Sequence, residues 1–392
     1  MAAMRTIEEL LQFAGDDYQI TVFGAEPRGN YNRILLSPLL AGDTDREQIM
    51  LHPPGWYSER GIVLYTGDPV VSIDRRSRRV ISAAGVVAGY DRLLLATGSD
   101  PVRLKVPGHD LPGVFSFRNI EDVDGMLAHA ERATRAVVIG GGLLGLEAAS
   151  GLARHGLKVT VVHIRDRVMD RQLDAEAAGL LQLAMEARGI EFCMEARTAA
   201  FEGDGRVERL RTEDGRVLEA GLAVVAAGIT PRTDLARACG LHCDRGVLVD
   251  DTLQTWDPSI YAVGECVQHR GTTYGLVAPL WEQARVCAAH LAERGVTRYR
   301  GSKPASQLKV SGIDVFSAGD IAGLHGTESI RYADHAAGIY RRLWLRDNRV
   351  LAAVMFGDTR AAAHFAELIE TQRDVSAQRE LLLLGEPAGA AA

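Results

Sequence analysis

"AVVIGGGLLGLEAASGLARHGLKVTVVH", residues 136–163, is the stretch that decides the fold. An apolar run leads into Gly140, Gly142 and Gly145, an alanine-rich helical pattern follows, and a second β-rich run ends at His163. A G-x-G-x-x-G string alone is weak evidence. Between a strand and a helix, however, it predicts a dinucleotide-binding βαβ unit.

Each glycine of this loop has an expected role. Gly140 permits the tight turn, Gly142 lets backbone N–H groups approach a pyrophosphate, and Gly145 lets helix and strand pack closely. The pyrophosphate then meets the positive end of the helix dipole. A glycine turn without a ligand is the alternative. Glu147 has two interpretations: it reaches the nicotinamide carboxamide, or it is an acid favoured by the helix dipole.

The residue that ends the second strand bears on the choice of coenzyme. NAD sites have Asp or Glu there, to bind the ribose 2′-OH. This chain has His163, followed by Arg165 and Arg167. Basic residues favour a 2′-phosphate and hence NADPH, unless the two arginines are merely solvated. The sequence predicts NAD(P)H and leaves the choice open.

Composition excludes several classes of protein. The 392 residues suffice for two or three domains, and 47% hydrophobic with 24% charged residues is ordinary for a globular protein. A net charge of −7 argues against a nucleic-acid partner. No apolar run approaches the ~18–20 residues that span a bilayer, so no membrane partner is expected. Five cysteines give no disulfide framework, which favours a cytoplasmic location.

Two further stretches point to a second dinucleotide. "YDRLLLATGSDP", residues 90–101, runs into Thr97–Gly98, and "TLQTWDPSIYAVGEC", residues 252–266, ends in Gly264–Glu265. They resemble the second and third FAD fingerprints of the flavoproteins with two dinucleotide-binding domains. The resemblance implies that Glu265, where Asp is usual, holds the ribityl chain. "AAGITPRTDL", which contains Gly228, resembles the segment that closes the NAD(P)H domain.

The start of the chain resembles the end of an FAD βαβ unit. It has a predicted helix Met4–Phe13 and a strand from Gln19 that ends near Glu26. The resemblance implies that Glu26 binds the ribose and that Ala3 fills the third glycine position. The first strand and its two glycines would then lie before Met1. We therefore expect that the native protein begins upstream, which an in-frame apolar strand followed by G-x-G would establish.

Four longer stretches carry the sharpest resemblance. They are "VFGAEPRGNYNRILLSPLLAG" (22–42), "VVHIRDRVMDRQLD" (161–174), "HRGTTYGLVAPLWEQA" (269–284) and "QLKVSGIDVFSAGD" (307–320). They resemble the N-terminal flavoprotein region of NAD(P)H-dependent assimilatory nitrite reductase large subunits, and equally the electron-transfer subunit of assimilatory nitrate reductase. The resemblance implies that NAD(P)H reduces FAD, which passes electrons to an iron–sulfur and sirohaem partner.

The same resemblance implies a flavin pocket lined by Asn32, Arg33 and Ser37. Pro38 stands where related reductases often have a lysine. Asn32 and Arg33 are ordinary loop residues in the alternative interpretation. Pro279 suits the first turn of a helix whose N-terminus would favour the reduced, anionic flavin.

The cysteine positions decide the reaction type. Disulfide reductases and cysteine-dependent peroxidases need a thiol in the flavin half, but the first cysteine is Cys193. Electrons therefore leave the flavin directly, and no catalytic side chain is expected. "CGLHC" offers Cys239, His242 and Cys243, but zinc or iron–sulfur sites need a second pair, so no metal site is predicted.

Together these patterns predict an α/β protein with two Rossmann-like dinucleotide-binding domains, for FAD and NAD(P)H, and a small α+β C-terminal domain. The expected boundaries are 1–112 and 244–296 for FAD, 113–243 for NAD(P)H and 297–392 for the C-terminal domain. A homodimer stays open. The large subunits that the chain resembles continue into a sirohaem domain, so we expect either a stand-alone reductase subunit that hands electrons to a separate protein or a fragment of a split gene. The alternatives are a ferredoxin or rubredoxin reductase of another pathway, or a non-catalytic NAD(P)H-binding remnant.

Overall fold

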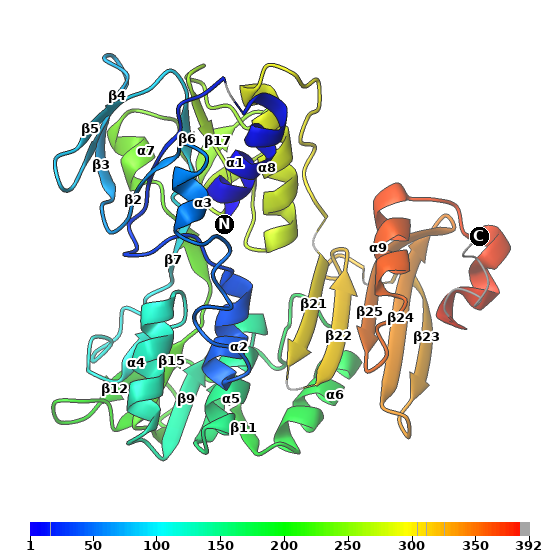
Figure 1. The fold of residues 1–392 in the computed structure, drawn as a ribbon. Helices are drawn as coiled ribbons and strands as arrows, with labels where there is room; N and C mark the ends of the chain where they lie inside the picture. The colour runs from blue at the N-terminus through cyan, green and yellow to red at the C-terminus, as the bar shows by residue number, and fades with distance from the viewer. Residues whose placement is uncertain (16, 304, 311, 325, 385–392) are drawn as a thin grey trace. The chain divides into compact units, whose positions relative to one another are not determined.

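The computed structural model describes residues 1–15, 17–303, 305–310, 312–324 and 326–384 (Figure 1). Its contacts divide the chain into two compact units. Unit 1 comprises Met1–Leu39, Thr44–Pro101 and Ile229–Ser302, and unit 2 comprises Leu40–Asp43, Val102–Gly228 and Lys303–Ala392. The breaks after Pro101 and Gly228 come earlier than the boundaries at 112 and 243 that the sequence suggested.

Unit 1 contains eighteen elements that the structure describes, most of them short strands. In chain order they are α1 (Ala2–Ala14), β1 (Thr21–Phe23), the 3-10 helix η1 (Arg33–Leu35), α2 (Leu36–Ala41, whose last two residues fall in unit 2), α3 (Gly55–Ser58), β2 (Val63–Tyr65), β3 (Val70–Asp74), β4 (Arg79–Ser82), β5 (Val87–Gly89), β6 (Leu93–Leu95), β7 (Ser99–Pro101), β16 (Ile229–Pro231), α7 (Asp234–Ala238), β17 (Val247–Val249), β18 (Ile260–Ala262), β19 (Val267–His269), β20 (Thr272–Thr273) and α8 (Val277–Leu291).

The parallel strands of unit 1 form two separate pairs. β1 pairs with β2, and β6 pairs with β18. Between β2 and β6 the chain forms the antiparallel sheet β3-β4-β5. Helix α1 is longer than the predicted Met4–Phe13, and its apolar residues at helical spacing explain why it forms: Met4 and Ile7 pack against Tyr57 and Ile62.

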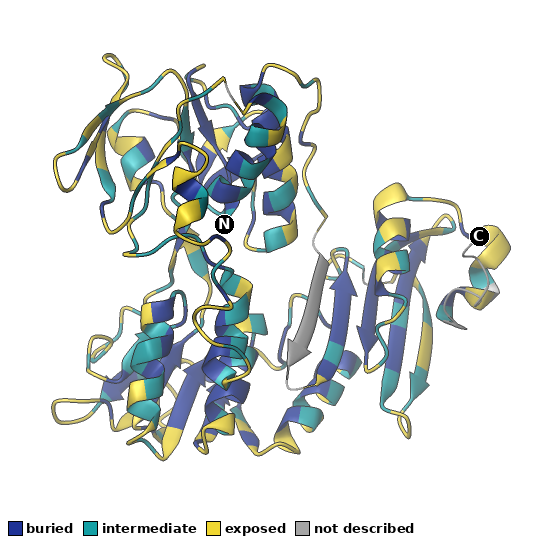
Figure 2. Cartoon of the chain, in the orientation of Figure 1, coloured by how far each residue is buried: buried dark blue, intermediate teal, exposed yellow. Residues whose placement is uncertain are grey.

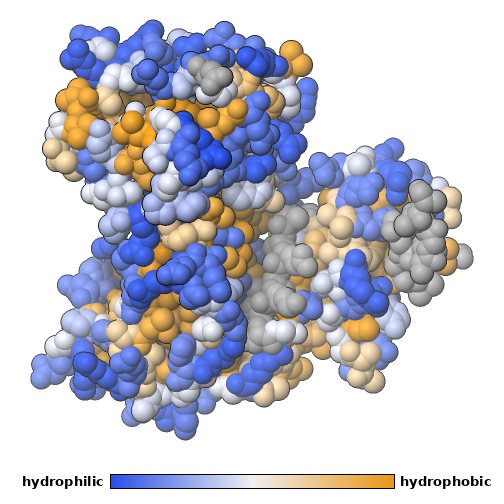
Figure 3. Space-filling model, in the orientation of Figure 1, coloured by the Kyte–Doolittle hydropathy of each residue, from blue (hydrophilic) through white to orange (hydrophobic). Residues whose placement is uncertain are grey.

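Apolar side chains remain exposed on the three-stranded sheet of unit 1. Val71 in β3, Ile81 in β4 and Val87 in β5 are exposed to between 37% and 57%. Figure 3 shows apolar surface over this part of unit 1. The outer face of this sheet therefore contributes little to the core.

Unit 2 contains the second dinucleotide fold and the C-terminal region. Its elements are β8 (Val114–Ser116), α4 (Ile120–Ala130), β9 (Arg135–Ile139), α5 (Leu143–Arg154), β10 (Lys158–Val162), α6 (Ala175–Glu186), β11 (Ile190–Cys193), β12 (Thr198–Glu202), β13 (Arg209–Thr212), β14 (Val217–Glu219), β15 (Leu222–Val225), β21 (Ala305–Val310), β22 (Ile313–Ala318), β23 (Glu328–Asp334), β24 (Ile339–Arg346), β25 (Arg349–Phe356), α9 (Ala362–Thr371) and the 3-10 helix η2 (Ser376–Leu384).

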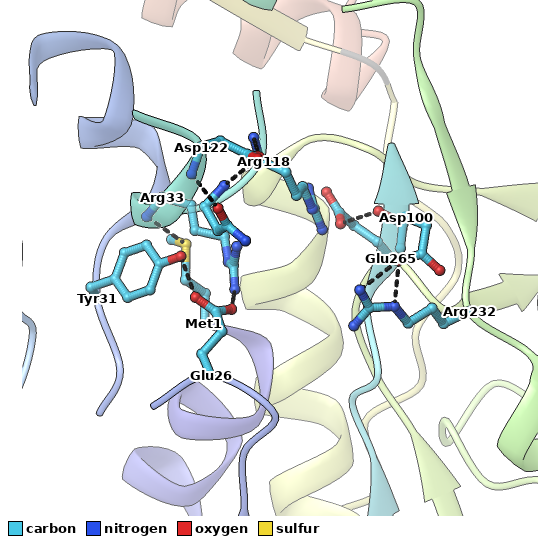
Figure 4. Close-up of polar contacts among 11 residues, drawn as sticks. Met1, Glu26, Tyr31, Arg33, Asp100, Arg118, Asp122, Arg232 and Glu265 are labelled. Atoms are coloured by element: carbon cyan, nitrogen blue, oxygen red, sulfur yellow. Dashed lines mark hydrogen bonds and ion pairs between the residues drawn. The ribbon is translucent and has the colours of Figure 1, made fainter. Parts of the chain in front are cut away.

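The parallel sheet of unit 2 has the order β11-β10-β9-β15-β8. Its central strand β9 is buried at four of five residues and β15 at all four, as expected for inner strands of a parallel sheet (Figure 2). Asn119 caps α4 by accepting the N–H of Asp122, and the Asp122 carboxylate accepts the N–H of Arg118 at 2.7 Å (Figure 4). The predicted βαβ unit around the glycine loop is confirmed.

The C-terminal region folds as an antiparallel sheet of order β21-β22-β25-β24-β23. Helix α9 packs on it, with Phe365 and Leu368 buried against Leu343 and Met355. This arrangement confirms the predicted α+β class of the tail.

Candidate functional site

The glycine loop of unit 2 joins β9 to α5. Gly140 has φ +125°, a conformation that a residue with a side chain rarely adopts. A Cβ on Gly145 would lie 1.9 Å from the carbonyl oxygen of Gly140, so helix and loop approach as closely as the sequence predicts. A Cβ on Gly142 would meet nothing within 4 Å. Gly142 therefore borders open space at the start of α5.

The start of α5 is suited to an anion. Gly142 is its N-cap and supplies no side-chain hydrogen bond, so the first N–H groups of a twelve-residue helix keep their donors available. Glu147 is half-buried in the second turn. Gly228 has φ +110° and follows β15, and its carbonyl accepts the N–H of Val102 at 2.9 Å. These residues fit the pyrophosphate of a dinucleotide.

His163 lies directly against the glycine loop. Its Nδ1 accepts the N–H of Gly141 at 3.0 Å, and a Cβ on Gly141 would lie 2.9 Å from the imidazole ring. The side chain is only 11% exposed. The sequence placed His163 at the strand end but did not reveal this contact, which needs the loop and the end of β10 to be folded together.

The sequence-predicted flavin residues all lie in unit 1, where Figure 4 shows two groups of polar contacts. In the first, the Glu26 carboxylate forms an ion pair with Arg33 and accepts the hydroxyl hydrogen of Tyr31 at 2.6 Å. The sulfur of Met1 lies 3.3 Å from the backbone N of Arg33. Glu26 is therefore held in place at the end of the strand, next to the start of α1.

Asn32 and Ser37 stand beside this group. The Asn32 side chain caps η1 by accepting the N–H of Ile34 at 3.1 Å. Ser37 lies in α2 and is half-buried. The structure thus gives Asn32 a structural role as a helix cap. Lining of a flavin pocket by Asn32, Arg33 and Ser37 stays a prediction.

The second group follows β6 and β18. Glu265 accepts the Ser99 hydroxyl hydrogen at 2.7 Å. The hydroxyl of Thr97 donates to the carbonyl of Arg232 at 3.0 Å, and the Arg232 guanidinium donates to Asp100 at 2.7 Å. Two predicted residues, Thr97 and Glu265, are thereby brought to one place, where β7 pairs with β16.

The backbone around Thr97 and Glu265 decides whether these residues can bind a dinucleotide. Gly264 has φ +93°, and a Cβ there would lie 3.1 Å from the Cβ of Ala2. Gly98 has φ +69°. The amide oxygen of Gln283 accepts the N–H of Gly264 at 2.9 Å, and its buried Nε2 donor interacts with Tyr299. A buried amide donor therefore lies close to the turn where an acceptor-rich ligand is expected. The residues present fit the ribityl and ribose ends of FAD.

Two helix starts in unit 1 also offer free N–H groups. α1 begins at Ala2 with no capping side chain, and α8 begins at Val277 with Leu276 as an N-cap that forms no side-chain bond. Pro279 is the third residue of α8, in its first turn as predicted. Both helices present a positive dipole end suited to anionic groups of a cofactor.

All five thiols are poorly suited to redox chemistry. Burial raises the pKa of each cysteine, which disfavours the reactive thiolate. Cys266 and Cys287 are fully buried. The Sγ of Cys266 lies 3.3 Å from the carbonyl oxygen of Val263, behind the Gly264 turn. In the part of the chain that is described, no three His, Cys, Asp or Glu side chains cluster as metal ligands.

The geometry of both glycine turns agrees with comparison to known proteins. Residues 1–290 match the family described as pyridine nucleotide-disulphide oxidoreductase, and residues 304–373 match the rubredoxin NAD+ reductase C-terminal domain. The chain belongs to the pyridine nucleotide-disulphide oxidoreductase family. Membership confirms the predicted superfamily and the fold class.

Three relatives are similar to this chain over two thirds or more of its length. The chain is 48% identical to Bacillus subtilis nitrite reductase (NAD(P)H), over 98% of this chain and 48% of that protein. It is 42% identical to the assimilatory nitrate reductase electron transfer subunit of the same organism, over 99% and 50%. It is 36% identical to the rubredoxin-NAD(+) reductase of Ectopseudomonas oleovorans, over 67% and 69%. The chain spans about half the length of the first two relatives.

Solved structures share the fold across nearly the whole chain. The ferredoxin reductase for the CYP199A2 system from Rhodopseudomonas palustris has a TM-score of 0.84 at 28% identity, covering 93% of this chain and 90% of its own. The putidaredoxin reductase in a covalent complex with putidaredoxin has a TM-score of 0.88 at 26% identity, covering 99% and 94%. Among the described residues, no helix is both long and apolar enough to cross a bilayer.

Proposed function

We propose that this chain is the reductase part of a nitrite- or nitrate-assimilating system, passing electrons from NAD(P)H through FAD to an iron–sulfur or sirohaem partner in the cytoplasm. The observation that carries the proposal is the 48% identity to a nitrite reductase over 98% of this chain. The separate glycine turns of unit 1 and unit 2 support a second dinucleotide besides NAD(P)H.

The chain's own residues would bind and orient the two cofactors. In unit 2, the start of α5 receives the pyrophosphate of NAD(P)H, with His163 beside the loop. In unit 1, Glu26 binds the ribose of FAD and Glu265 its ribityl chain, each held by a neighbouring side chain. FAD, when bound, supplies the ability to take up a hydride and release electrons singly. No side chain need exchange a proton with a substrate.

The absence of a sulfur relay supports direct electron transfer. The family includes enzymes that use a redox disulfide, yet the sequence has no cysteine before Cys193, and all five thiols have raised pKa values. A mechanism that passes electrons through a thiolate would need one with a lowered pKa. The electrons therefore leave by the flavin itself.

A visible absorption spectrum of the purified 392-residue chain tests the proposal. A yellow protein that bleaches when NADH or NADPH is added without oxygen supports it. Reoxidation of the bleached protein by a sirohaem- and iron–sulfur-containing nitrite reductase module identifies the acceptor. A colourless protein that still binds NAD(P)H would support the non-catalytic remnant instead.

A ferredoxin or rubredoxin reductase is the second candidate. The match of residues 304–373 to the rubredoxin NAD+ reductase C-terminal domain favours it, as does the 69% coverage of a rubredoxin-NAD(+) reductase. The same reoxidation experiment separates the two functions. Rapid reoxidation by rubredoxin or ferredoxin, with slow reoxidation by the nitrite reductase module, would favour this candidate.

A further inference from the structure

The segment His163–Asp170 lies where a dinucleotide fold distinguishes NADH from NADPH. A carboxylate at the end of the second strand accepts the ribose 2′-OH, and a 2′-phosphate needs basic groups instead. The strand β10 ends at Val162, so the position of that carboxylate is taken by His163. The question is which charge this segment presents.

Two hydrogen bonds with Gly141 join the two ends of the segment to the glycine loop. Gly141 donates its N–H to Nδ1 of His163 at 3.0 Å and accepts the N–H of Met169 at 2.8 Å. Met169 is buried and has φ +47°, so the chain turns sharply there. Asp170, the next residue, is thereby placed beside the loop that receives the dinucleotide.

The imidazole of His163 points toward this carboxylate. Because Nδ1 accepts a hydrogen bond, the proton of the neutral ring is on Nε2. Nε2 lies 3.3 Å from Oδ1 of Asp170, although this buried N–H forms no hydrogen bond with it. The Asp170 side chain remains 27% exposed. His163 therefore lies beside a carboxylate that is still open to a ligand.

The arginines of the segment are matched by its own acids. Arg165 Nε lies 3.9 Å from Oδ2 of Asp170, and Arg167 Nη1 lies 3.3 Å from the carboxylate of Asp166. Between His163 and Asp170 two arginines face two aspartates, and the exposed Arg171 follows directly. The two arginines that the sequence offered for a 2′-phosphate are thus each paired with an acid of the segment.

We propose that Asp170, placed beside the glycine loop by the bond from Met169 to Gly141, is the residue that selects the coenzyme, and that it favours NADH over NADPH. The inference rests on the proposed function, because it concerns the dinucleotide that unit 2 binds. The Asp170 carboxylate accepts a hydrogen bond from the ribose 2′-OH and repels a 2′-phosphate, which carries up to two negative charges at neutral pH.

Binding measurements without turnover test this selection. We expect the wild-type chain to bind NADH about tenfold more tightly than NADPH in isothermal titration calorimetry, the affinity ratio that one well-placed charge typically supplies. In Asp170→Asn the ratio should fall to about one, mainly because NADPH binds more tightly. Competition with 2′,5′-ADP and with 5′-AMP isolates the contribution of the 2′-phosphate.

Asp166→Asn is the matched control. It removes the same charge from the same segment, but from the carboxylate that pairs with Arg167. The NADH to NADPH ratio should stay close to that of the wild type. Asp170→Glu keeps the charge and should keep the preference, which guards against a folding defect in the asparagine variant.

Three results would overturn the inference. The first is tighter binding of NADPH than of NADH by the wild-type chain, the second an unchanged ratio in Asp170→Asn, and the third an equal change in Asp166→Asn. Failure of the proposed function is distinguishable, because it shows as a colourless protein or as slow reoxidation by the nitrite reductase module, whichever dinucleotide binds more tightly. Binding of both dinucleotides with equal affinity, together with a bleachable flavin, would also overturn the inference but would leave the proposed function standing.

Discussion

The two dinucleotide folds have the same order of elements but differ at the centre of the sheet. In unit 2, β9 precedes α5, β10 and β11 follow, and an antiparallel three-stranded sheet leads to β15. In unit 1, α1, β1 and β2 are followed by an antiparallel three-stranded sheet and β6. The pair β2-β1 of unit 1 therefore corresponds to β11-β10 of unit 2, and the pair β6-β18 corresponds to β15-β8. In unit 1, β1 and β6 thus hold the positions that flank β9 in unit 2.

Among the described residues of unit 1, no strand joins β1 to β6. The consequence is visible in their burial. All four residues of β15 are buried, whereas Leu93 and Leu94 of β6 and Val22 and Phe23 of β1 are only half-buried. Inner strands of a parallel sheet normally bury both faces. The comparison teaches that the described residues of unit 1 keep the helices and turns of the cofactor site without a strand between β1 and β6.

Supplying the central strand should have the largest effect. We would fuse a copy of residues 134–142, "TRAVVIGGG", directly before Met1. Burial of its apolar side chains, at about 1.5–3 kcal/mol each, should outweigh the ordering of the segment and raise the melting temperature by about 5–10 °C. Calorimetry and the amount of FAD retained on gel filtration measure the result.

The control fusion carries aspartate in place of its two adjacent valines. It should neither stabilise the protein nor improve FAD retention, because two charges cannot enter a buried strand position without a large desolvation cost. Equal effects of the two fusions would show that the added strand does not pair between β1 and β6.

Enlarging the third glycine of unit 2 should have the next largest effect. Unit 1 has Ala3 at the position that corresponds to Gly145, but a Cβ on Gly145 would lie 1.9 Å from the Gly140 carbonyl oxygen. Gly145→Ala should cost about 1–3 kcal/mol of stability and weaken NADH binding by tenfold or more. Chemical denaturation and calorimetric titration give the two values.

Gly142→Ala is its counterpart, because a Cβ there meets nothing within 4 Å. This variant should keep the wild-type free energy of unfolding within about 1 kcal/mol, since only the helix N-cap changes. It should still weaken NADH binding, because the methyl group stands where the pyrophosphate approaches. Loss of stability in both variants would mean that the loop has no spare room for a ligand.

A smaller effect is expected from Glu26→Gln in unit 1. The substitution replaces by a neutral amide the carboxylate that forms an ion pair with Arg33 and accepts the Tyr31 hydroxyl hydrogen. FAD affinity should fall by about tenfold, since hydrogen bonds to charged groups contribute about 1.5–3 kcal/mol. NADH binding by unit 2 should not change. A matching loss of NADH affinity would show that the two folds do not bind independently.

The smallest effects concern acid, to which one aspartate of each unit responds in the opposite sense. Hydrogen bonds from Arg270 and His269 lower the pKa of Asp251 in unit 1, so its stabilising contribution is lost as the pH falls below about 4. Burial raises the pKa of Asp122 in unit 2, so the folded state gains stability as the pH falls through that raised value.

Melting temperatures of two variants over a range of about pH 3–7 check these signs. Asp251→Asn should flatten the acid decline of stability, whereas Asp122→Asn should steepen it by removing the compensating gain. The same slope in both variants and in the wild type would contradict the assignment.

Local patterns predicted the parts of the molecule that depend on neighbouring residues. The loop from Gly140 to Gly145 was readable because a turn, a helix start and a close approach all fall within six residues. Glu26 and Glu265 followed from resemblance at strand ends. Each of these residues was recognisable from the short stretch of chain around it, although Glu265 is held by Ser99, 166 positions earlier.

Contacts between distant residues were not predictable in this way. The Arg232 guanidinium donates to Asp100, which lies 132 positions earlier, and only the pairing of β7 with β16 brings them together. Asp170 was missed for a related reason, because its place beside the glycine loop depends on the bond from Met169 to Gly141. A sequence pattern shows that an arginine is present but not whether an acid neutralises it.

The low reactivity expected of all five thiols has a practical consequence. Because Cys193, Cys266 and Cys287 lie inside the core and the remaining two have raised pKa values, alkylating probes should react slowly with the native protein. A single cysteine introduced on an exposed loop would then be the preferred target for a fluorophore or spin label. Each unit can thus be tagged at a chosen point without first removing the natural sulfhydryl groups.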